Sequence, residues 1–424
     1  MGNIMVSDES VGSEGGGVLS FLQPLLVYPI WVYIVLAAII KFLFQKPWGM
    51  YSARAKAIER VQQKRSARFE EFRSRVSTED GEVIGKRNRI LHMEFCTLRD
   101  ALQKEELTAV EVLETYYWKA IQVQERLNCI NEVIVESWEW AREADEKWRG
   151  KSPKPPLYGV PFSVKGNFHV VGYDCNLGLG KYTENPMTDE CTFVTHLRYL
   201  GAIPFVITTV PQALLSFVCS SSVYGTTCNP HDVTRSPGGS SGGEAVLHSS
   251  GGSPFGTGSD LLGSLRIPAS FCGLTVMKPS ESRFVVRGAH GGVPGRGRLG
   301  LGYGFFTHSV NEQMELLKEV LGHDHYAKLV PDSGRMKLDL DKCKSNSKLR
   351  IGYYDVRRAV REVVEKLRAE GHELIPFTVP RAQDAAQLMF KNALPDGGSY
   401  SRFLYSNDVV DKHMKQFVRL LGVS

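Results

Sequence analysis

The chain has 424 residues, 42% of them apolar, which is enough for a hydrophobic core and excludes an intrinsically disordered protein. Its formal net charge of +5 is small for this length and its basic residues are spread out, so the composition does not indicate a nucleic-acid partner. The 8 cysteines occur singly, without CxxC or zinc-finger spacing, and we expect reduced thiols in a cytosolic environment.

An uncharged apolar run extends from Val18 to Ile40 and is long enough to cross a hydrocarbon layer of about 30 Å as a helix. Pro24 and Pro29 lie toward its start, so a tilted or partly interfacial segment stays open. A cleaved signal peptide is the alternative, but acidic residues precede the run and it is too long for that class. We expect a transmembrane anchor at residues 18–44, after an N-terminal tail at residues 1–17.

Basic residues dominate the stretch that follows the apolar run. By the positive-inside tendency, the bulk of the chain is expected on the cytosolic side, in a single-pass membrane protein. The same stretch is suited to anionic headgroups. Residues 45–94 are expected to be a basic linker with a solvated helix at residues 52–76, before a main domain at residues 95–424. The basic side chains are Lys41, Lys46, Arg54, Lys56, Arg60, Lys64, Arg65 and Arg68.

Hydrophobic periodicity predicts alternating helices and strands in the main domain. Thr108 and Glu111 form a capping box ahead of an amphipathic helix at residues 109–127. Alternation of this kind predicts an α/β layered domain with a largely parallel sheet. The other expected elements are a helix at 192–200, a strand at 202–210, a strand at 349–354, a helix at 356–370 and a strand at 372–379.

Residues 236–268 are rich in glycine and serine but hold interleaved apolar residues, so we expect an ordered segment and not a flexible linker. A P-loop requires GxxxxGK followed by Ser or Thr, and no lysine occurs here. Leu261 stands where a dinucleotide-binding fingerprint has its third glycine, which disfavours a nucleotide site. The pattern favours a loop whose amides approach a reacting centre while serines supply hydroxyls, as in an oxyanion hole with a serine nucleophile.

At these residues the sequence resembles the amidase signature family, and in particular its eukaryotic fatty acid amide hydrolase branch. The resemblance covers approximately residues 95–400. It implies an α/β amidase signature fold, with a mixed twisted sheet core flanked by helices and an N-terminal transmembrane helix, and no cofactor is expected. The matching motifs are YGVPFSVKGNF, VPQALLSF, SPGGSSGGE, SSGGSPFGTGSD, GSLRIPASFCG and MKPS.

Carried over residue by residue, the resemblance implies Lys165 as the base, Ser240 as the relay serine and Ser264 as the nucleophile. The histidines do not lie in a motif such as GxSxG, so no Ser-His pair is indicated. A lysine acts as a base only when it is neutral, and burial lowers its pKa because desolvation penalises the ammonium form. Neutral Lys165 is expected to take the proton of Ser240, which takes that of Ser264 as it attacks the carbonyl.

The resemblance implies further roles near the nucleophile. The backbone amides of residues 261–264 are expected to hold the developing oxyanion, and Asp260 with Arg266 resembles the family's structural ion pair. Four apolar residues resemble lining positions of an acyl pocket, although a generic core explains such residues equally well: Leu214, Leu215, Phe217 and Ile267. The expected substrate contacts are Leu214, Ser240, Leu261, Leu262, Gly263 and Ser264.

The sequence departs from the family at two points. Leu262 stands where the family has the first of two adjacent glycines. A side chain there crowds the oxyanion pocket or strains the backbone if the position needs positive φ, or else it points away from the substrate, and both readings stay open. The family's domain also continues beyond the point where this chain stops, so we expect a C-terminally shortened domain.

The leading hypothesis is a membrane-anchored serine amidase of the endoplasmic reticulum that hydrolyses long-chain fatty acid amides, namely N-acylethanolamines and primary fatty amides. Its expected partners are the lipid amide and the membrane, and a homodimer is left open. No metal is expected, because His323, Asp324 and His325 have no third His or Cys nearby. The competing hypothesis is a catalytically weak or inactive lipid-binding paralogue or fragment, and an amidase for small amides is the third.

Overall fold

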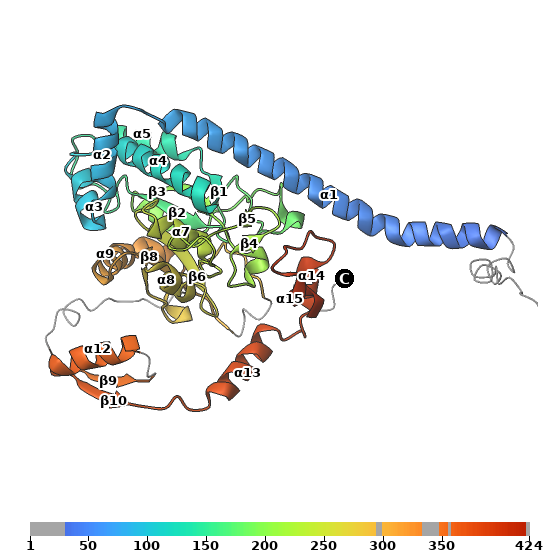
Figure 1. Cartoon of the computed structure of the whole chain (residues 1–424). Coiled ribbons are helices and arrows are strands. Elements are labelled where there is room, and N and C mark those ends of the chain that lie inside the picture. The colour runs from blue at the N-terminus through green and yellow to red at the C-terminus, as the bar shows by residue number, and fades with distance from the viewer. Residues whose placement is uncertain (1–29, 294–298, 333–346, 355–357, 421–424) are drawn as a thin grey trace, which may run out of the picture. The chain divides into compact units, whose positions relative to one another are not determined.

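The computed structural model describes residues 30–293, 299–332, 347–354 and 358–420 (Figure 1). It separates into two compact units, Met1–Ala53 and Arg54–Ser424. The expected tail and the first part of the expected anchor, residues 18–29, lie outside the described residues. Helix α1 (Ile30–Val76) begins within the expected anchor. Of the helices in the described part of the chain, none is both long and apolar enough to cross a membrane.

A sheet of six strands forms the centre of the second unit, with helices packed around it (Figure 1). Its strand order is β1 (Ile130–Val133), β3 (Ile203–Thr208), β2 (Pro161–Lys165), β6 (Gly256–Asp260), β8 (Gly302–Thr307) and β7 (Thr275–Val276). The helices are α2 (Gly81–Leu91), α3 (Phe95–Gln103), α4 (Ala109–Leu127), α5 (Ser137–Trp148), α6 (Thr192–Tyr199), α7 (Gly242–Ser249), α8 (Arg266–Cys272), α9 (Val310–Leu321) and α10 (Asp324–Leu329). In the core between these layers, the rings of Phe162 and Phe255 stack with centroids 5.4 Å apart.

The strand directions are mixed. β2 is parallel to β3 and β6, whereas β1 pairs antiparallel with β3, and β8 pairs antiparallel with β6 and β7. The mixed sheet implied by the family resemblance is confirmed, and the largely parallel sheet expected from alternation is wrong. Parallel pairing needs long crossover connections. Here it is confined to the three strands that α6 and α7 connect.

Local sequence signals place several elements correctly. The Thr108 hydroxyl accepts the Glu111 amide at 3.1 Å, and the Glu111 carboxylate accepts the Thr108 amide at 3.0 Å, so α4 begins at the expected capping box. The helix and strand expected at 192–200 and 202–210 are α6 and β3. The 7 cysteines of the described residues, which exclude Cys343, are free thiols.

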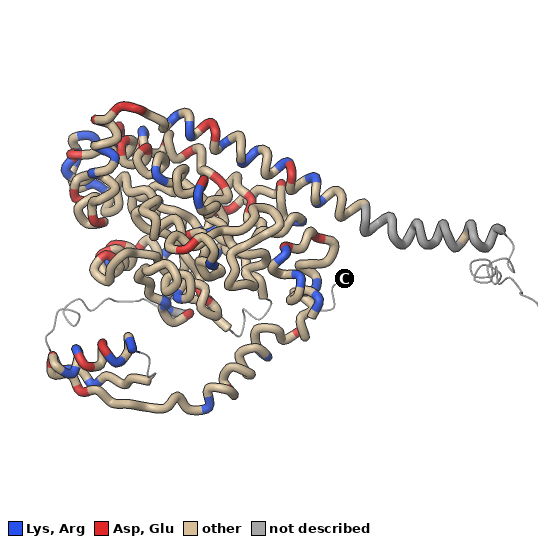
Figure 2. Tube along the Cα trace, in the orientation of Figure 1, with Lys and Arg blue, Asp and Glu red and all other residues tan. Residues whose placement is uncertain are grey.

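The part of α1 within the second unit, residues 54–76, carries a buried stripe. Ile58, Val61, Phe72 and Val76 are buried at helical spacing. Lys, Arg and Glu side chains, of both charge signs, are frequent along the rest of this part of the helix (Figure 2). The expectation of a solvated linker helix is therefore wrong for this part, because the apolar stripe contributes to the core.

The described residues of the C-terminal part form a small separate sheet and four helices. The parallel strands β9 (Arg350–Tyr353) and β10 (Glu373–Pro376) flank α12 (Arg358–Ala369) in sequence, which confirms the expected strand-helix-strand series. These strands pair only with each other in the described residues and do not extend the six-stranded sheet.

The remaining elements are a ribbon of β4 (Ser220–Ser221) and β5 (Gly225–Thr226), 3₁₀ turns at Gly180–Tyr182, Gln212–Leu214 and Glu281–Arg283, and helices α13 (Ala382–Ala393), α14 (Ser399–Tyr405) and α15 (Lys415–Leu420).

Candidate active site

Lys165 is the last residue of β2 and is completely buried. Its Nζ atom lies 3.0 Å from Ser240 Oγ, 2.8 Å from Ser259 Oγ and 3.3 Å from the Ser259 carbonyl oxygen. Burial lowers the pKa of Lys165 to about 7, although the carboxyl groups of Asp260 and Glu244 oppose this effect. In a large fraction of the molecules, the side chain of Lys165 is therefore neutral at neutral pH. A neutral amine is what proton acceptance requires.

Hydrogen bonds to Ser259 orient the amine of Lys165. A neutral amine has two N–H donors and one lone pair, and the hydroxyl and carbonyl oxygens of Ser259 can accept both donors. The Ser259 hydroxyl in turn donates to Asn167 Oδ1 at 3.5 Å. This arrangement leaves the lone pair of Lys165 for the hydroxyl of Ser240.

Ser240 lies buried in the turn before α7. The peptide bond between Gly239 and Ser240 is cis. A Cβ atom on Gly239 would lie 2.3 Å from the Ser216 carbonyl oxygen, so only glycine fits at that position. The amide of Ser241 donates to the Ser264 carbonyl oxygen at 3.2 Å, and this bond joins the Ser240 turn to the loop that holds Ser264.

The buried carboxylate of Asp260 organises the loop between β6 and α8. It accepts the amides of Gly263 at 2.7 Å and Leu265 at 3.1 Å, and the Arg266 guanidinium donates to both of its oxygens at 2.9 Å. Burial raises the pKa of Asp260, but these hydrogen bonds outweigh burial and leave the pKa below its ordinary value. The ion pair implied by the family resemblance is present, and it determines the path of the backbone around Ser264.

The four amides expected to hold the oxyanion are not equivalent. The Gly263 amide is engaged by Asp260, whereas those of Leu261, Leu262 and Ser264 have no acceptor among the residues that the structure describes. Gly263 has φ +115°, a conformation that favours glycine, and a Cβ atom there would meet Ile267 Cδ1 at 2.5 Å. Leu262 is not among the non-glycine residues with positive φ, so the departure from the family at this position strains no backbone.

Ser240 and Ser264 line one cavity of about 510 Å³, a usual size for a small-molecule site. Its wall is mainly apolar, and Lys165 lies behind Ser240 and does not line it. Among the residues described, the wall consists of Asn167, Leu214, Leu215, Ser216, Phe217, Ser240, Ser259, Leu261, Leu262, Ser264, Gly291, Gly292, Val293, Leu301, Met389, Phe390, Ala393, Leu394 and Phe417.

Most of the expected substrate contacts reach this wall. Leu214, Leu215 and Phe217 line the cavity. Leu262 lines it as well, so a ligand bound beside Ser264 would meet this residue. Gly263 and Ile267 do not line it, because Gly263 turns toward Asp260 and Ile267 packs against Gly263. Leu214 has φ +62°, a strained conformation for a leucine that is typical of functional sites.

Sequence reasoning missed several residues of the site. Asn167 and Ser259 lie within the YGVPFSVKGNF and SSGGSPFGTGSD motifs, so their proximity to Lys165 could have been suspected from the motifs themselves. Met389, Phe390 and Phe417 come from α13 and α15 and carry no sequence signal, since an apolar residue in a helix usually packs in a core.

Comparison with known proteins gives the following matches. The family profile described as Amidase matches residues 111–421. The chain is 38% identical over 349 residues to fatty acid amide hydrolase 1 of Caenorhabditis elegans, covering 79% of this chain and 61% of that protein. It is 33% identical over 345 residues to fatty-acid amide hydrolase 1 of Sus scrofa, covering 78% of this chain and 58% of that protein. The chain thus spans less than two thirds of the length of these two relatives.

A solved structure of a fatty acid amide hydrolase is similar to the described fold. The two superpose with a TM-score of 0.75 over 88% of this chain and 75% of the other, at 22% sequence identity. The likeness covers the α/β fold with its mixed sheet and surrounding helices.

Proposed function

Because the chain belongs to the amidase family, we propose that it hydrolyses amide bonds, with Ser264 as nucleophile, Ser240 as proton relay and Lys165 as base. The observation that carries the proposal is the 3.0 Å contact between Lys165 Nζ and Ser240 Oγ, in a buried place directly behind the cavity wall. Burial lowers the pKa of Lys165 to about 7, and groups with a pKa shifted in this way are frequent at catalytic sites.

The proposed reaction proceeds through an acyl-enzyme. Ser264 Oγ bonds to the amide carbon and passes its proton to Ser240, which passes its own proton to Lys165. The protons then return by the same path to the leaving nitrogen, and the carbon–nitrogen bond breaks. Water attacks the ester with the same groups acting in the same order, which releases the acid and restores Ser264.

The developing oxyanion is proposed to bind the amides of Leu261, Leu262 and Ser264. Each is without an acceptor among the described residues, and each belongs to the loop that Asp260 holds in place. One such donor typically lowers the barrier by about 3–4 kcal/mol. The Gly263 amide is left out of this set because it already donates to Asp260.

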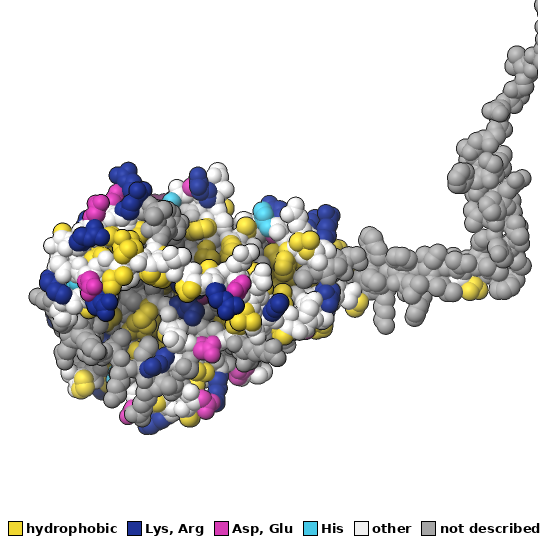
Figure 3. Space-filling model, turned by 90° about the horizontal axis from the view of Figure 1, so that it is seen from below, with side chains coloured by type: hydrophobic (Ala, Val, Ile, Leu, Met, Phe, Trp, Pro, Cys, Tyr) yellow, Lys and Arg dark blue, Asp and Glu magenta, His cyan; other side chains and the backbone are white. Residues whose placement is uncertain are grey.

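The proposed substrates are long-chain fatty acid amides, including N-acylethanolamines and primary fatty amides. The mainly apolar cavity wall supports an acyl chain, and two of the similar proteins are named fatty acid amide hydrolases. Hydrophobic side chains are exposed on the face drawn in Figure 3. Exposed apolar residues include Phe217 and Phe390, which also line the cavity, and they suit a lipid that arrives from a membrane.

The proposed location is the endoplasmic reticulum membrane, with residues 18–44 as the anchor and the amidase domain on the cytosolic side. The apolar run and the basic residues after it support this orientation. Fusing a glycosylation acceptor to either side and testing which one is modified would check it. Modification of a site in the domain would contradict the proposal.

The first test of the activity is labelling of membranes that contain the full chain with a fluorophosphonate probe, which reacts with activated serines. We expect labelling of the wild type and background labelling of Ser264→Ala. Ser216→Ala is the matched control, because Ser216 lines the same cavity but has no proposed role, and it should be labelled as the wild type is. Equal labelling of Ser264→Ala, or none of folded wild type, would contradict the assignment.

A second candidate function is a lipid-binding protein without activity, and Leu262 is the observation that favours it, since it lines the cavity beside Ser264. Leu262→Gly separates the two. The proposed hydrolase cleaves a fatty amide with leucine in place, and the variant changes the rate only moderately. If release of fatty acid is detected with the variant alone, the natural protein is a binding protein.

A further inference from the structure

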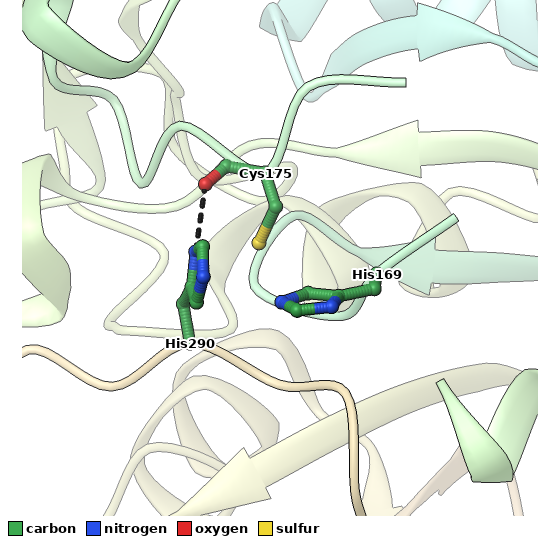
Figure 4. Close-up of side chains that lie close together, drawn as sticks. All are labelled: His169, Cys175 and His290. Carbon is green, nitrogen blue, oxygen red and sulfur yellow. Dashed lines mark hydrogen bonds between the residues drawn. The ribbon is translucent and has the colours of Figure 1, made fainter. Parts of the chain in front are cut away.

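Three potential metal ligands converge outside the Lys165–Ser240–Ser264 site. His169, Cys175 and His290 each offer a donor atom, and these atoms lie within 4.8 Å of one another. Figure 4 shows the Cys175 side chain pointing toward the space between the two imidazole rings. The ring centroids of His169 and His290 are 4.6 Å apart. The sequence does not suggest this cluster, because His290 is more than 100 residues from His169 and Cys175 along the chain.

The orientation of His169 leaves a buried acceptor without a partner. Its Nδ1 atom lies 3.0 Å and 3.1 Å from the two carboxylate oxygens of Asp189, so in the neutral ring Nδ1 carries the proton and Nε2 carries the lone pair. The Nε2 atom is buried and has no hydrogen-bond partner in the described part of the chain. A buried polar atom in that state costs free energy and indicates a missing partner.

The other imidazole also uses its Nδ1 atom as a donor. His290 Nδ1 donates to the backbone carbonyl oxygen of Cys175 at 3.0 Å, which places the lone pair of the neutral ring on Nε2 (Figure 4). Metal-binding histidines usually donate their second ring nitrogen to a carboxylate or a backbone carbonyl, and the two rings here show one case of each.

We propose that His169, Cys175 and His290 bind a zinc ion, with Asp189 orienting His169. Two imidazoles and one thiolate are ligands that Zn²⁺ favours, whereas Mg²⁺ and Ca²⁺ favour oxygen. Zinc bonds of about 2.0–2.3 Å in a tetrahedron separate neighbouring donors by about 3.3–3.6 Å, so closure on the ion needs movements of roughly 1 Å. The Cys175 thiol loses its proton to solvent when the ion binds, and the thiolate and Asp189 together balance the charge of the ion.

The site lies next to the cavity wall. Residues 166–168 connect Lys165 to His169, and the Asn167 and His290 backbones are joined by a 2.9 Å hydrogen bond. The Asn167 side chain also donates to the His290 carbonyl oxygen at 3.0 Å. Residues 291–293, which follow His290, line the cavity. A zinc ion at this site would therefore connect the two wall segments that contain Asn167 and residues 291–293. We expect it to raise the thermal stability of the protein.

The test is a zinc titration of the full chain after removal of metals with a chelator. We expect the wild type to bind about one equivalent, with a higher melting temperature, and to bind Co²⁺ with a thiolate charge-transfer absorption band. Cys175→Ser and His290→Ala should lose this equivalent and the temperature shift. Cys272→Ser is the matched control, since Cys272 is equally buried with its thiol on a backbone carbonyl, and it should bind as the wild type does.

Asp189→Asn keeps the test independent of core folding, because the Asp189 side chain is 63% exposed. Loss of its orienting carboxylate should weaken zinc binding about 10–100-fold. The proposal is overturned if the metal-free wild type takes up no zinc at micromolar free concentration. It is also overturned if Asp189→Asn and Cys175→Ser bind as tightly as Cys272→Ser, since the zinc then sits elsewhere. Neither result depends on amidase activity.

Discussion

At the scale of single residues, the proposed role of Lys165 as a base depends on its surroundings more than on its chemical type. The side chain is completely buried, and the polar atoms within hydrogen-bonding distance of its Nζ belong to Ser240 and Ser259. No carboxylate forms an ion pair with it in the described part of the chain. Burial therefore lowers its pKa to about 7, whereas an exposed lysine would be an ammonium ion and could not accept a proton.

This pKa predicts the pH dependence of the reaction. Since Lys165 is neutral above its pKa of about 7, the rate of fluorophosphonate labelling should rise between roughly pH 6 and pH 8 and then level off. Lys165→Ala should lower the rate about 10²–10⁴-fold and abolish the rise. Labelling rates measured across this range check both. A wild-type rate that is constant over the same range would rule out Lys165 as the base.

The same pKa has a consequence for stability. Between about pH 7 and the ordinary lysine value of 10.5, the unfolded chain binds a proton that the native chain does not. The stability of the native state therefore rises with pH across this window, as far as Lys165 contributes.

At the scale of elements, α1 shows that a helix rich in charged residues can still pack an apolar stripe against the core. Phe72 is 2% exposed, and its ring lies 5.0 Å from that of Tyr117 and 5.4 Å from that of Trp138, measured between centroids. The Arg75 guanidinium lies over the Trp138 ring at 3.8 Å. Residues 54–76 thus pack against the core of the second unit, and their charged side chains occupy the remaining faces of the helix.

Phe72→Ala tests this packing. Removal of a buried aromatic ring should lower the free energy of unfolding by about 3–5 kcal/mol, because the cavity left behind fills only partly. Glu71→Ala, at the adjacent exposed position, should change it by less than about 0.5 kcal/mol. Urea unfolding of the two variants gives the comparison. A solvated linker helix would make both changes equally small.

At the scale of the whole domain, the cavity depends on segments that are remote in sequence. Ser264 follows β6, Leu214 belongs to a turn after β3, and Met389 comes from α13 near the C-terminus. The Tyr405 hydroxyl of α14 donates to the Gln212 carbonyl oxygen at 3.0 Å, which links the C-terminal helices to the turn that holds Leu214. The C-terminal part of this chain therefore shapes the site even though it contributes no polar group to the proposed chemistry.

Met389→Trp should make the cavity smaller and shift substrate preference toward short acyl chains. Exclusion of two methylenes costs about 1.6 kcal/mol, which lowers kcat/KM for long-chain amides roughly tenfold relative to short ones. Leu388→Trp is the control, since Leu388 is 62% exposed and does not line the cavity. Hydrolysis of an acyl-chain series by both variants is the measurement. An equal effect of Met389→Trp on short and long amides would contradict the proposed acyl pocket.

The amino-acid sequence alone determines the family, the mixed sheet that the family implies and the helix that begins at Thr108, because these follow from ordered motifs and from contacts within a few residues. It also identifies Lys165, Ser240 and Ser264 as candidates. Tertiary structure alone decides that Lys165 faces Ser259 and that His290 meets His169 and Cys175. These contacts join residues brought together by strand pairing and loop closure, and no local pattern in the chain encodes such distances.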